Sequence, residues 1–156
     1  MRGHEQIIAT LNKLLREELT AINQYMVHAE MCDNWGYEKL HKDIQKRAID
    51  EMKHAEKLIG RLLFLEGAPT VSQLEAIRIG KDVKGILEND LAAESTAVLS
   101  YNAAIVQALE IRDGGTRELL EDILKDEERH LDRLEAQRDQ VAQMGIQNYL
   151  AEQSGE

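Results

Sequence analysis

Most of the chain repeats its apolar residues at helical spacing, and this pattern extends over four long segments. The segments cover residues 5–34, 38–66, 83–111 and 116–144. Apolar residues three or four positions apart share one face of an α-helix, so each segment predicts a long amphipathic helix. Aromatic residues make up only 4% of the chain and Pro69 is its one proline, which disfavours strands and favours uninterrupted helices. The sequence therefore predicts an all-α fold.

The connections between these segments differ in length, and their lengths predict the topology. NWG at residues 34–36 and RDGG at residues 112–115 are short breaks, and Thr116 is the expected N-cap of the fourth helix. Residues 67–82 form the longest irregular stretch, which suits a crossover between the two halves of the chain. Short, long and short connections predict a four-helix bundle with one long crossover. IQNYLA at residues 146–151 predicts a short fifth helix at the C-terminal end.

Length, charge and cysteine content narrow the classes of function. The chain of 156 residues suffices for one core, so we expect residues 1–156 to form a single domain. The net charge of -10 argues against nucleic-acid binding through a basic surface. One cysteine, Cys32, leaves no internal disulfide and fits a reducing compartment. No apolar run approaches the length of a membrane span and the N-terminus lacks a signal-peptide pattern, so we expect a cytoplasmic protein without a membrane partner.

Two similar sequences, DEMKH at residues 50–54 and DEERH at residues 126–130, divide the chain into related halves. The two copies are offset by 76 residues (126 − 50), and other polar residues follow the same offset. Each half has a glutamate, a tyrosine seven positions later, and a Glu-x-x-His motif. These residues are Glu18, Tyr25, Glu51 and His54 in the first half, and Glu94, Tyr101, Glu127 and His130 in the second. Beyond the apolar pattern, what the halves share is concentrated in these polar residues.

The glutamates and histidines of both halves lie among the apolar residues of the predicted helices. Glu18 falls between Leu14 and Ala21 on the apolar stripe of its segment, and Glu94 has the same position on the third segment. The two residues of a Glu-x-x-His motif are three positions apart, so both side chains lie on one helix face, and both motifs interrupt apolar stripes. We therefore expect all six side chains to point into the core of the bundle.

Four carboxylates in a core would be unstable as uncompensated ions. Removal from water and mutual repulsion would raise their pKa values and cost on the order of several kcal/mol for each unpaired charge. Two divalent cations would neutralise the four charges, and two neutral imidazoles would complete the ligand set. Carboxylate and imidazole ligands suit iron, manganese and zinc. One Glu from each of two helices and Glu-x-x-His from each of the other two is the pattern of dimetal carboxylate bundles.

The alternative to a dimetal site is that the same residues lie at the solvent-exposed surface of the helices. A single Glu-x-x-His motif on a helix is usually a solvated pair. Two copies at one offset, each with a matched glutamate upstream and all on apolar stripes, are not typical of surface residues. The pattern therefore favours the dimetal site.

Four stretches of the sequence resemble the ferritin superfamily and, within it, the bacterioferritin branch. They are LNKLLREELTAINQY at residues 11–25, IDEMKHAEKLIGRLLFLEGAP at 49–69, LKDEERHLDRLE at 124–135 and MGIQNYLAEQ at 144–153. The resemblance covers essentially the whole chain and implies a ferritin-like bundle with a short C-terminal helix. It also implies iron storage and detoxification inside a shell of 24 subunits built from two-fold dimers, which can include a second type of subunit.

The resemblance further implies an enzyme activity and a role for each of the six residues. The activity is that of a ferroxidase, which oxidises Fe(II) with O2 or H2O2 at two iron ions within each subunit and deposits a ferric mineral. Glu18 and His54 would hold one iron, Glu94 and His130 the other, and Glu51 and Glu127 would bridge them. A ferredoxin that donates electrons for iron release is a further expected partner.

Tyrosines and aspartates beside the six residues are candidates for supporting roles. Tyr25 is common beside the site in the family that the chain resembles, so Tyr25 joins the six as a candidate catalytic residue. A buried phenol needs a hydrogen-bond partner, and we expect Tyr25 and Tyr101 to donate to ligand carboxylates. The alternative is that both are core aromatics. Asp50 and Asp126 are expected to orient the histidines, although a solvated helix position explains Asp50 equally well.

Met52 has no counterpart in the second half, where Glu128 takes its place. It follows Glu51 by one residue and is rotated by about 100° around the helix, so it points away from the dimetal site. From the residues alone, a methionine packed at a contact between subunits accounts for it. The resemblance implies that Met52 of two subunits binds the iron of one haem b across a two-fold axis. That haem would pass electrons to stored ferric iron.

Two other functions fit parts of the sequence. A soluble di-iron oxidase or peroxide reductase of the rubrerythrin kind would use similar ligands, but it usually has Cys-x-x-Cys pairs and does not need Met52. A haem-binding shell with an idle metal site conflicts with the complete set of six ligands. Lys46 stands where some bacterioferritins have a cavity-side histidine, which removes a potential iron ligand. His4, His28 and His41 lack partners at ligand spacing and are expected to have no role in the site.

Overall fold

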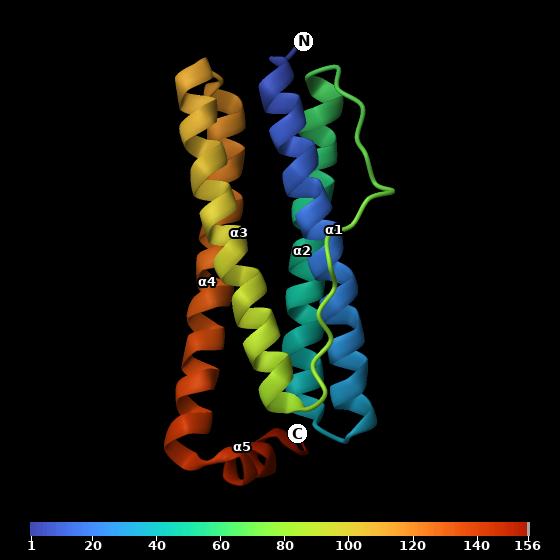
Figure 1. Cartoon of the computed structure of the whole chain (residues 1–156), viewed down its shortest axis with the longest axis vertical. Coiled ribbons are helices and arrows are strands. Elements are labelled where there is room, and N and C mark those ends of the chain that lie inside the picture. Colours follow the sequence, from blue (N-terminus) through green and yellow to red (C-terminus); the bar gives the residue numbers. More distant parts are fainter. Residues whose placement is uncertain (156) are drawn as a thin grey trace.

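The computed structural model describes residues 1–155, and it shows four long helices in a bundle with a short fifth helix across one end (Figure 1). The elements are α1 (Glu5–Asn34), α2 (Glu38–Phe64), α3 (Val83–Ile111), α4 (Gly114–Met144) and α5 (Ile146–Gln153). Within the described residues there is no strand. The predicted all-α fold, with its long crossover and short C-terminal helix, is confirmed. None of the helices in residues 1–155 combines the length and the apolarity that a membrane crossing requires.

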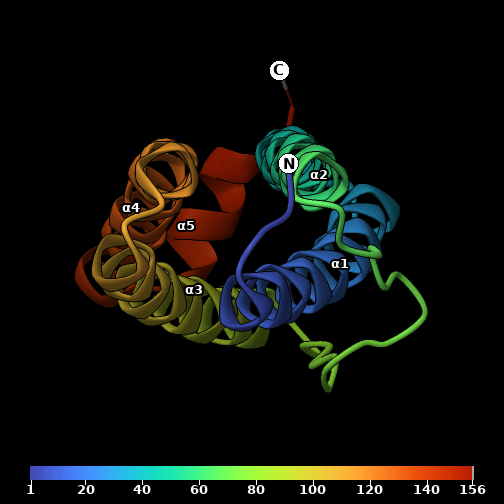
Figure 2. The same cartoon turned by 90° about the horizontal axis from the view of Figure 1, so that it is seen from above.

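Short turns join α1 to α2 and α3 to α4, so each of these pairs is antiparallel, whereas the crossover returns the chain along the bundle (Figure 1). Seen from above, the four helices stand at four corners, with α1 between α2 and α3 (Figure 2). The crossover lies against α1 through side chains of that helix. The Thr20 hydroxyl accepts a hydrogen bond from the backbone N–H of Glu75 at 2.8 Å, and Gln24 Oε1 accepts one from Arg78 N at 3.0 Å.

Helices α2 and α4 end where the backbone adopts a positive φ, which a right-handed α-helix does not contain. α2 ends at Phe64, two residues before the predicted Glu66, because Glu66 has a φ of 61° in the left-handed region. α4 ends at Met144, where Gly145 has a φ of 82° that glycine adopts without strain. The chain can therefore turn at Gly145 and begin α5 across the end of the bundle.

The beginning of α4 differs from the prediction. Thr116 is not the N-cap: Asp113 is the cap, and its carboxylate accepts a hydrogen bond from the Thr116 N–H at 3.0 Å. The Thr116 hydroxyl donates to Asp113 Oδ2 at 2.7 Å and accepts from Arg61 Nε at 3.0 Å. Arg61 also donates to Asp113 Oδ1 at 2.9 Å. A carboxylate held by a hydroxyl and a guanidinium is a stronger acceptor than a hydroxyl alone, so the helix begins at Gly114.

The core of the bundle consists of two apolar clusters with a polar layer between them. The first cluster is centred on the upper part of the bundle and includes Ile7, Leu11, Leu14, Leu58, Leu62, Leu120 and Ile123. The second lies toward α5 and includes Ala29, Leu40, Ile44, Ile86, Leu87, Leu134 and Tyr149. Each fully buried leucine contributes about 2 kcal/mol through removal of apolar surface from water. These two clusters hold the four helices in register around the residues that separate them.

We expect Asp113→Ala to lower the free energy of unfolding by about 1–2 kcal/mol, because it removes the N-cap of α4 and a partner of Arg61. Asp113→Asn keeps an oxygen that can cap the helix and should lose less. Urea unfolding followed by far-ultraviolet circular dichroism measures both changes.

Asp122→Ala, at an exposed position of the same helix, is the matched control and should leave the unfolding midpoint near that of the wild type. An Asp113→Ala variant as stable as this control would show that Asp113 does not fix the beginning of α4.

Candidate metal centre

Six polar side chains from all four long helices form the layer between the two apolar clusters. They are Glu18 from α1, Glu51 and His54 from α2, Glu94 from α3, and Glu127 and His130 from α4. His130 is 7% exposed and the other five are 2% exposed or less. Their predicted position in the core is therefore confirmed, and they are called the buried cluster below.

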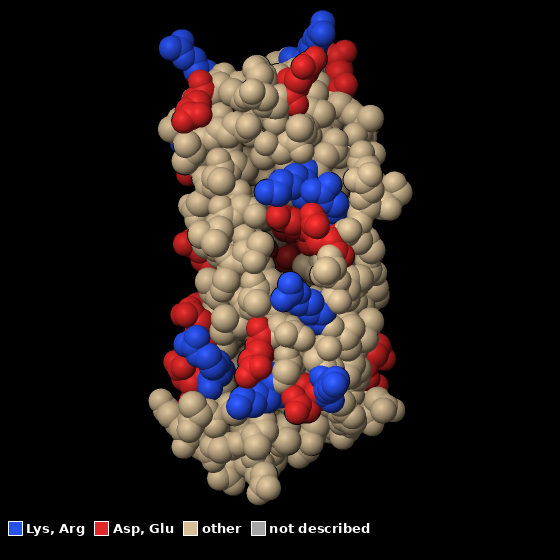
Figure 3. All heavy atoms as spheres, viewed as in Figure 1, with Lys and Arg blue, Asp and Glu red and all other residues tan. Residues whose placement is uncertain are grey.

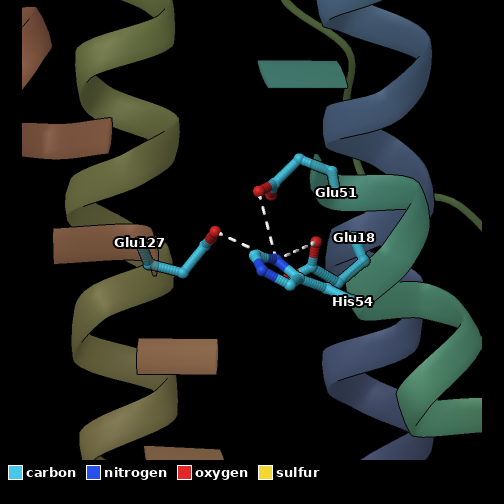
Figure 4. A group of neighbouring side chains, drawn as sticks. All are labelled: Glu18, Glu51, His54 and Glu127. Atoms are coloured by element: carbon cyan, nitrogen blue, oxygen red, sulfur yellow. Dashed lines mark ion pairs between the residues drawn. The ribbon is translucent and has the colours of Figure 1, made fainter. Parts of the chain in front are cut away.

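One side of the buried cluster is organised around His54. Its Nδ1 lies 3.2 Å from Glu127 Oε1, 3.3 Å from Glu51 Oε1 and 3.7 Å from Glu18 Oε2 (Figure 4). Three glutamates from three helices thus point at one imidazole nitrogen. The carboxylate oxygens and this nitrogen thus lie close together, as the ligands of one cation do.

The other side is organised in the same way around His130. Its Nδ1 lies 3.3 Å from Glu51 Oε1, and 3.4 Å from both Glu94 Oε1 and Glu127 Oε1. Glu51 and Glu127 therefore face both histidines, whereas Glu18 and Glu94 each face one. On each side, the potential ligand atoms all lie within 4.8 Å of one another. Two adjacent cations that share two carboxylates would fit this arrangement.

The inward-facing atoms of the buried cluster lack hydrogen-bond partners. Among residues 1–155, the buried atoms without a partner include Glu18 Oε2, Glu51 Oε1, His54 Nδ1, Glu94 Oε2, both carboxylate oxygens of Glu127, and His130 Nδ1. Buried polar atoms are normally paired, because an unpaired one pays its full cost of removal from water. Oxygen and imidazole nitrogen atoms that converge without partners are the donor set of a divalent transition metal. The residues present therefore fit two such ions.

Two aspartates fix the orientation of the histidines from the outer side. Asp126 Oδ2 lies 2.8 Å from His54 Nε2, and Asp50 Oδ2 lies 2.9 Å from His130 Nε2. When each Nε2 carries the proton and donates it to the aspartate, each Nδ1 presents a lone pair to the cluster. The prediction that these aspartates orient the histidines is confirmed, and each aspartate belongs to the opposite half of the chain.

The two tyrosines also pair across the halves. The Tyr25 hydroxyl donates to Glu94 Oε1 at 2.8 Å, and the Tyr101 hydroxyl donates to Glu18 Oε1 at 2.7 Å. Both tyrosines are 1% exposed. Their predicted hydrogen bonds to carboxylates of the buried cluster are confirmed, so they are more than packing residues. Each holds one oxygen of its glutamate and leaves the other free.

Burial and mutual repulsion control the protonation of the buried cluster. Burial, and then repulsion by the neighbouring carboxylates, raises the pKa of Glu51 well above its ordinary value. The same causes raise the pKa of Glu94 to about 7. Burial alone would lower the pKa of His130, but the nearby carboxylates of Glu127, Glu51 and Glu94 raise it to about 12. Without a metal the cluster therefore retains protons at neutral pH, and a cation that bound there would displace them.

A second buried charged group lies beside the cluster, and sequence reasoning missed it. Asp90 is 0% exposed and accepts hydrogen bonds from Arg47 at 2.8 Å and from Gln24 at 2.9 Å. The Arg47 guanidinium lies over the Tyr25 ring, 4.4 Å from its centroid. Asp90 thus holds the Arg47 guanidinium, and the guanidinium packs against the ring of Tyr25. Asp90 lies four positions before Glu94, so its place on the apolar stripe is the signal that could have identified it.

Two histidines have partners where the sequence predicted none. His28 Nδ1 lies 2.8 Å from Asp90 Oδ1, and His28 Nε2 accepts a hydrogen bond from the Gly80 N–H at 2.9 Å. His41 lies close to Asp33 and Glu38 at the end of the bundle. Asp90, Gly80 and Asp33 come from other helices or from the crossover, so the spacing of residues along one helix could not reveal them. Glu38 is different, because it lies on α2 three positions before His41.

Met52 and Lys46 lie outside the cluster on α2. Met52 is 48% exposed, so its predicted direction away from the cluster is confirmed. Lys46 is also exposed.

Comparisons with known proteins agree with this geometry. Residues 8–144 match the family model described as a ferritin-like domain. The chain is 39% identical over 152 residues to a bacterioferritin of Mycolicibacterium paratuberculosis, which covers 97% of this chain and 96% of that protein. It is 40% identical over 149 residues to bacterioferritins of Brucella melitensis and Rhodobacter capsulatus, which in each case covers 96% of this chain and 92% of the relative.

We expect Glu51→Gln to stabilise the metal-free protein and to abolish its stabilisation by Co(II). Glu51 binds its proton more tightly in the folded than in the unfolded chain, so at neutral pH its carboxyl group costs stability, and a neutral amide removes that cost. For the wild type, Co(II) at roughly one hundred times its Kd should add about 2.7 kcal/mol. Thermal unfolding with and without Co(II) measures both effects.

The exposed Glu56→Gln is the matched control, and it should retain the full response to Co(II). If Co(II) still raised the unfolding temperature of Glu51→Gln as much as that of this control, Glu51 would not belong to a metal site.

Proposed function

The chain belongs to the bacterioferritin branch of the ferritin family, and on this basis we propose that it stores iron and oxidises Fe(II) at the buried cluster. The observation that carries the proposal is the convergence of unpaired carboxylate oxygens and two imidazole nitrogens in the core. A cluster of this kind has no structural benefit without cations, because its burial costs stability. Iron as the substrate would supply the missing positive charge.

The six residues would divide between two iron ions according to their distances. Glu18 and His54 would bind one ion, and Glu94 and His130 the other. Glu51 and Glu127 would lie between the two ions, as their contacts with both histidines support. Bridging carboxylates keep two metal ions close enough to react with one molecule of oxidant.

Oxidation would remove one electron from each of two Fe(II) ions. O2 that takes both electrons and two protons becomes H2O2, and H2O2 that takes two electrons and two protons becomes two molecules of water. Protons displaced from Glu51 and Glu94 are available for this reduction, because burial makes these carboxyl groups retain protons near neutral pH. Tyr25 and Tyr101 would keep Glu94 and Glu18 oriented, and Tyr25 would act as the catalytic tyrosine of the site.

Storage would take place inside a cytoplasmic shell of 24 subunits, which can be homo-oligomeric or contain a second type of subunit. The nearly full-length match to bacterioferritins supports a shell. Exposed apolar side chains also support burial between subunits, since Phe64 is 51% exposed, Leu99 72% and Leu109 61%. A ferredoxin would donate the electrons that release the stored iron.

Met52 would bind haem b together with Met52 of a second subunit. Its exposed position on α2 supports a ligand for a group outside the subunit, because a two-fold axis would bring two copies of one side chain together. The haem would supply electron transfer to stored ferric iron. Met52 itself would hold the haem and place it between two subunits.

We expect Glu94→Gln to lower the initial rate of Fe(II) oxidation at least about tenfold, since a neutral amide replaces a charged ligand. The rate is measured from ferric absorbance after Fe(II) is mixed with the metal-free protein in air. Glu88→Gln, an exposed position on the same helix, should keep the wild-type rate. A Glu94→Gln variant that oxidised iron at the wild-type rate would contradict the assignment.

We expect Met52→Leu to abolish haem binding and to leave Fe(II) oxidation unchanged, because leucine fills similar space without a sulfur ligand. The ratio of haem to protein after reconstitution, measured by absorbance, tests this. Met26→Leu is the matched control, since Met26 is 49% exposed and Met52 48%. Haem bound by Met52→Leu with an unchanged spectrum would rule out Met52 as the ligand.

A further inference from the structure

A cavity of about 400 Å³ extends from the surface between α1, α3 and the crossover to the buried cluster. Its inner wall includes Glu18, Glu51 and Glu127, and its outer part is lined by side chains such as Glu75 and Arg78 from the crossover. Figure 3 shows the corresponding hollow near the middle of this face, with acidic atoms at its base and basic side chains above and below it. The cavity therefore connects the cluster with solvent on one side of the bundle.

Small side chains on the two facing helices leave this space open. On α3 the cavity is lined by Ala92, Ala93, Thr96 and Ala97, and on α1 by Thr20 and Ala21. These positions recur at helical spacing, so they form one face on each helix. The hollow therefore results from a row of small residues on each helix, and its lining reaches from the crossover to Glu18, Glu51 and Glu127.

Glu17 lies on the cavity face of α1, directly before Glu18 of the cluster. Glu17 Oε1 accepts a hydrogen bond from the Ser100 hydroxyl at 3.1 Å. Its other oxygen, Oε2, is a buried atom that has no hydrogen-bond partner within residues 1–155. One oxygen thus fixes the side chain against α3, and the other remains free to bind a cation.

Glu17 differs from Glu75, the acidic residue in the outer part of the cavity, in its charged partners. Glu75 Oε1 is paired with Arg16 Nε at 2.7 Å, and its side chain is 49% exposed. Glu75 is therefore already neutralised on the solvent side. Glu17 is the cavity-lining carboxylate that keeps a buried, unpaired oxygen without being one of the six cluster residues.

We propose that Glu17 is a transit ligand, which binds Fe(II) in the cavity and passes it to Glu18, Glu51 and Glu127. Fe(II) must lose bound water to enter a narrow space, and a carboxylate oxygen replaces that water and balances part of the charge. A negative charge in a cleft also raises the local concentration of cations and the rate at which they bind. This proposal rests on the proposed function, because it takes the buried cluster to be the place where iron is oxidised.

The test is the rate at which Co(II) binds to the metal-free, assembled protein, followed by stopped-flow absorbance. We expect Glu17→Gln to slow Co(II) association by about an order of magnitude. The equilibrium capacity should stay at two Co(II) per chain, because both ligand groups of the cluster are intact. Glu17→Asp should restore part of the rate. Glu110→Gln, with the same change of charge at an exposed position of α3, is the matched control and should bind at the wild-type rate.

Steady-state Fe(II) oxidation separates a transit role from a structural one. For Glu17→Gln we expect a higher half-saturating Fe(II) concentration and an unchanged rate at saturation. A role limited to holding Ser100 would leave both quantities and the Co(II) rate unchanged. A loss of the second bound Co(II) would make Glu17 a ligand of the cluster itself and would overturn the proposal.

A second variant tests the path without altering any carboxylate. Thr96 is exposed and lines the cavity, so Thr96→Phe should obstruct it and slow Co(II) association at unchanged capacity. Wild-type association rates in both Glu17→Gln and Thr96→Phe would overturn the proposal while the proposed function stands. A wild type that binds two Co(II) per chain but oxidises no Fe(II) would instead refute the proposed function, and the Co(II) rates would still decide the role of Glu17.

Discussion

Four carboxylates buried in the middle of the bundle are the constraint on which the rest of the structure depends. Each carboxylate would lower the stability of the folded protein as an unpaired ion in an apolar core, and repulsion between neighbouring carboxylates would lower it further. The two apolar clusters on either side supply the stability that offsets this cost. Tyrosine hydroxyls hold Glu94 and Glu18, and aspartates hold the two histidines, so that the inward-facing atoms of the cluster remain free. The protein thus maintains an unfavourable cluster in a form that two bound cations would make favourable.

The supporting hydrogen bonds also join the two halves of the chain. Tyr25 and Tyr101 connect α1 with α3, and Asp50 and Asp126 connect α2 with α4. Each bond links a residue of one half to a cluster residue of the other, so the register of the halves and the geometry of the cluster depend on each other. The Arg47–Asp90 pair has no such counterpart, and it makes the surroundings of Tyr25 different from those of Tyr101.

Helical periodicity was sufficient to predict the helices, their order and the burial of the six cluster residues, because these properties depend on residues close in sequence. The predicted N-cap of α4 was wrong, because Asp113 is held in its capping position by Arg61, which comes from another helix. The partners of His28 and the free oxygen of Glu17 could not be predicted, because they depend on which helices become neighbours and on how closely they pack. The placement of Met52 at the surface followed from its rotation around α2, but the group that it binds remains a proposal.

Aerobic iron loading of the purified, metal-free protein tests the central claim most directly. Fe(II) is added far beyond two ions per chain, the number that the buried cluster fits, and the product is separated by size with iron and protein detected together. The account predicts that the ferric iron stays soluble and elutes with the protein as a large assembly. Oxidation that stops near two ions per chain, with the excess iron precipitating, would contradict storage and leave a soluble di-iron oxidase as the better description.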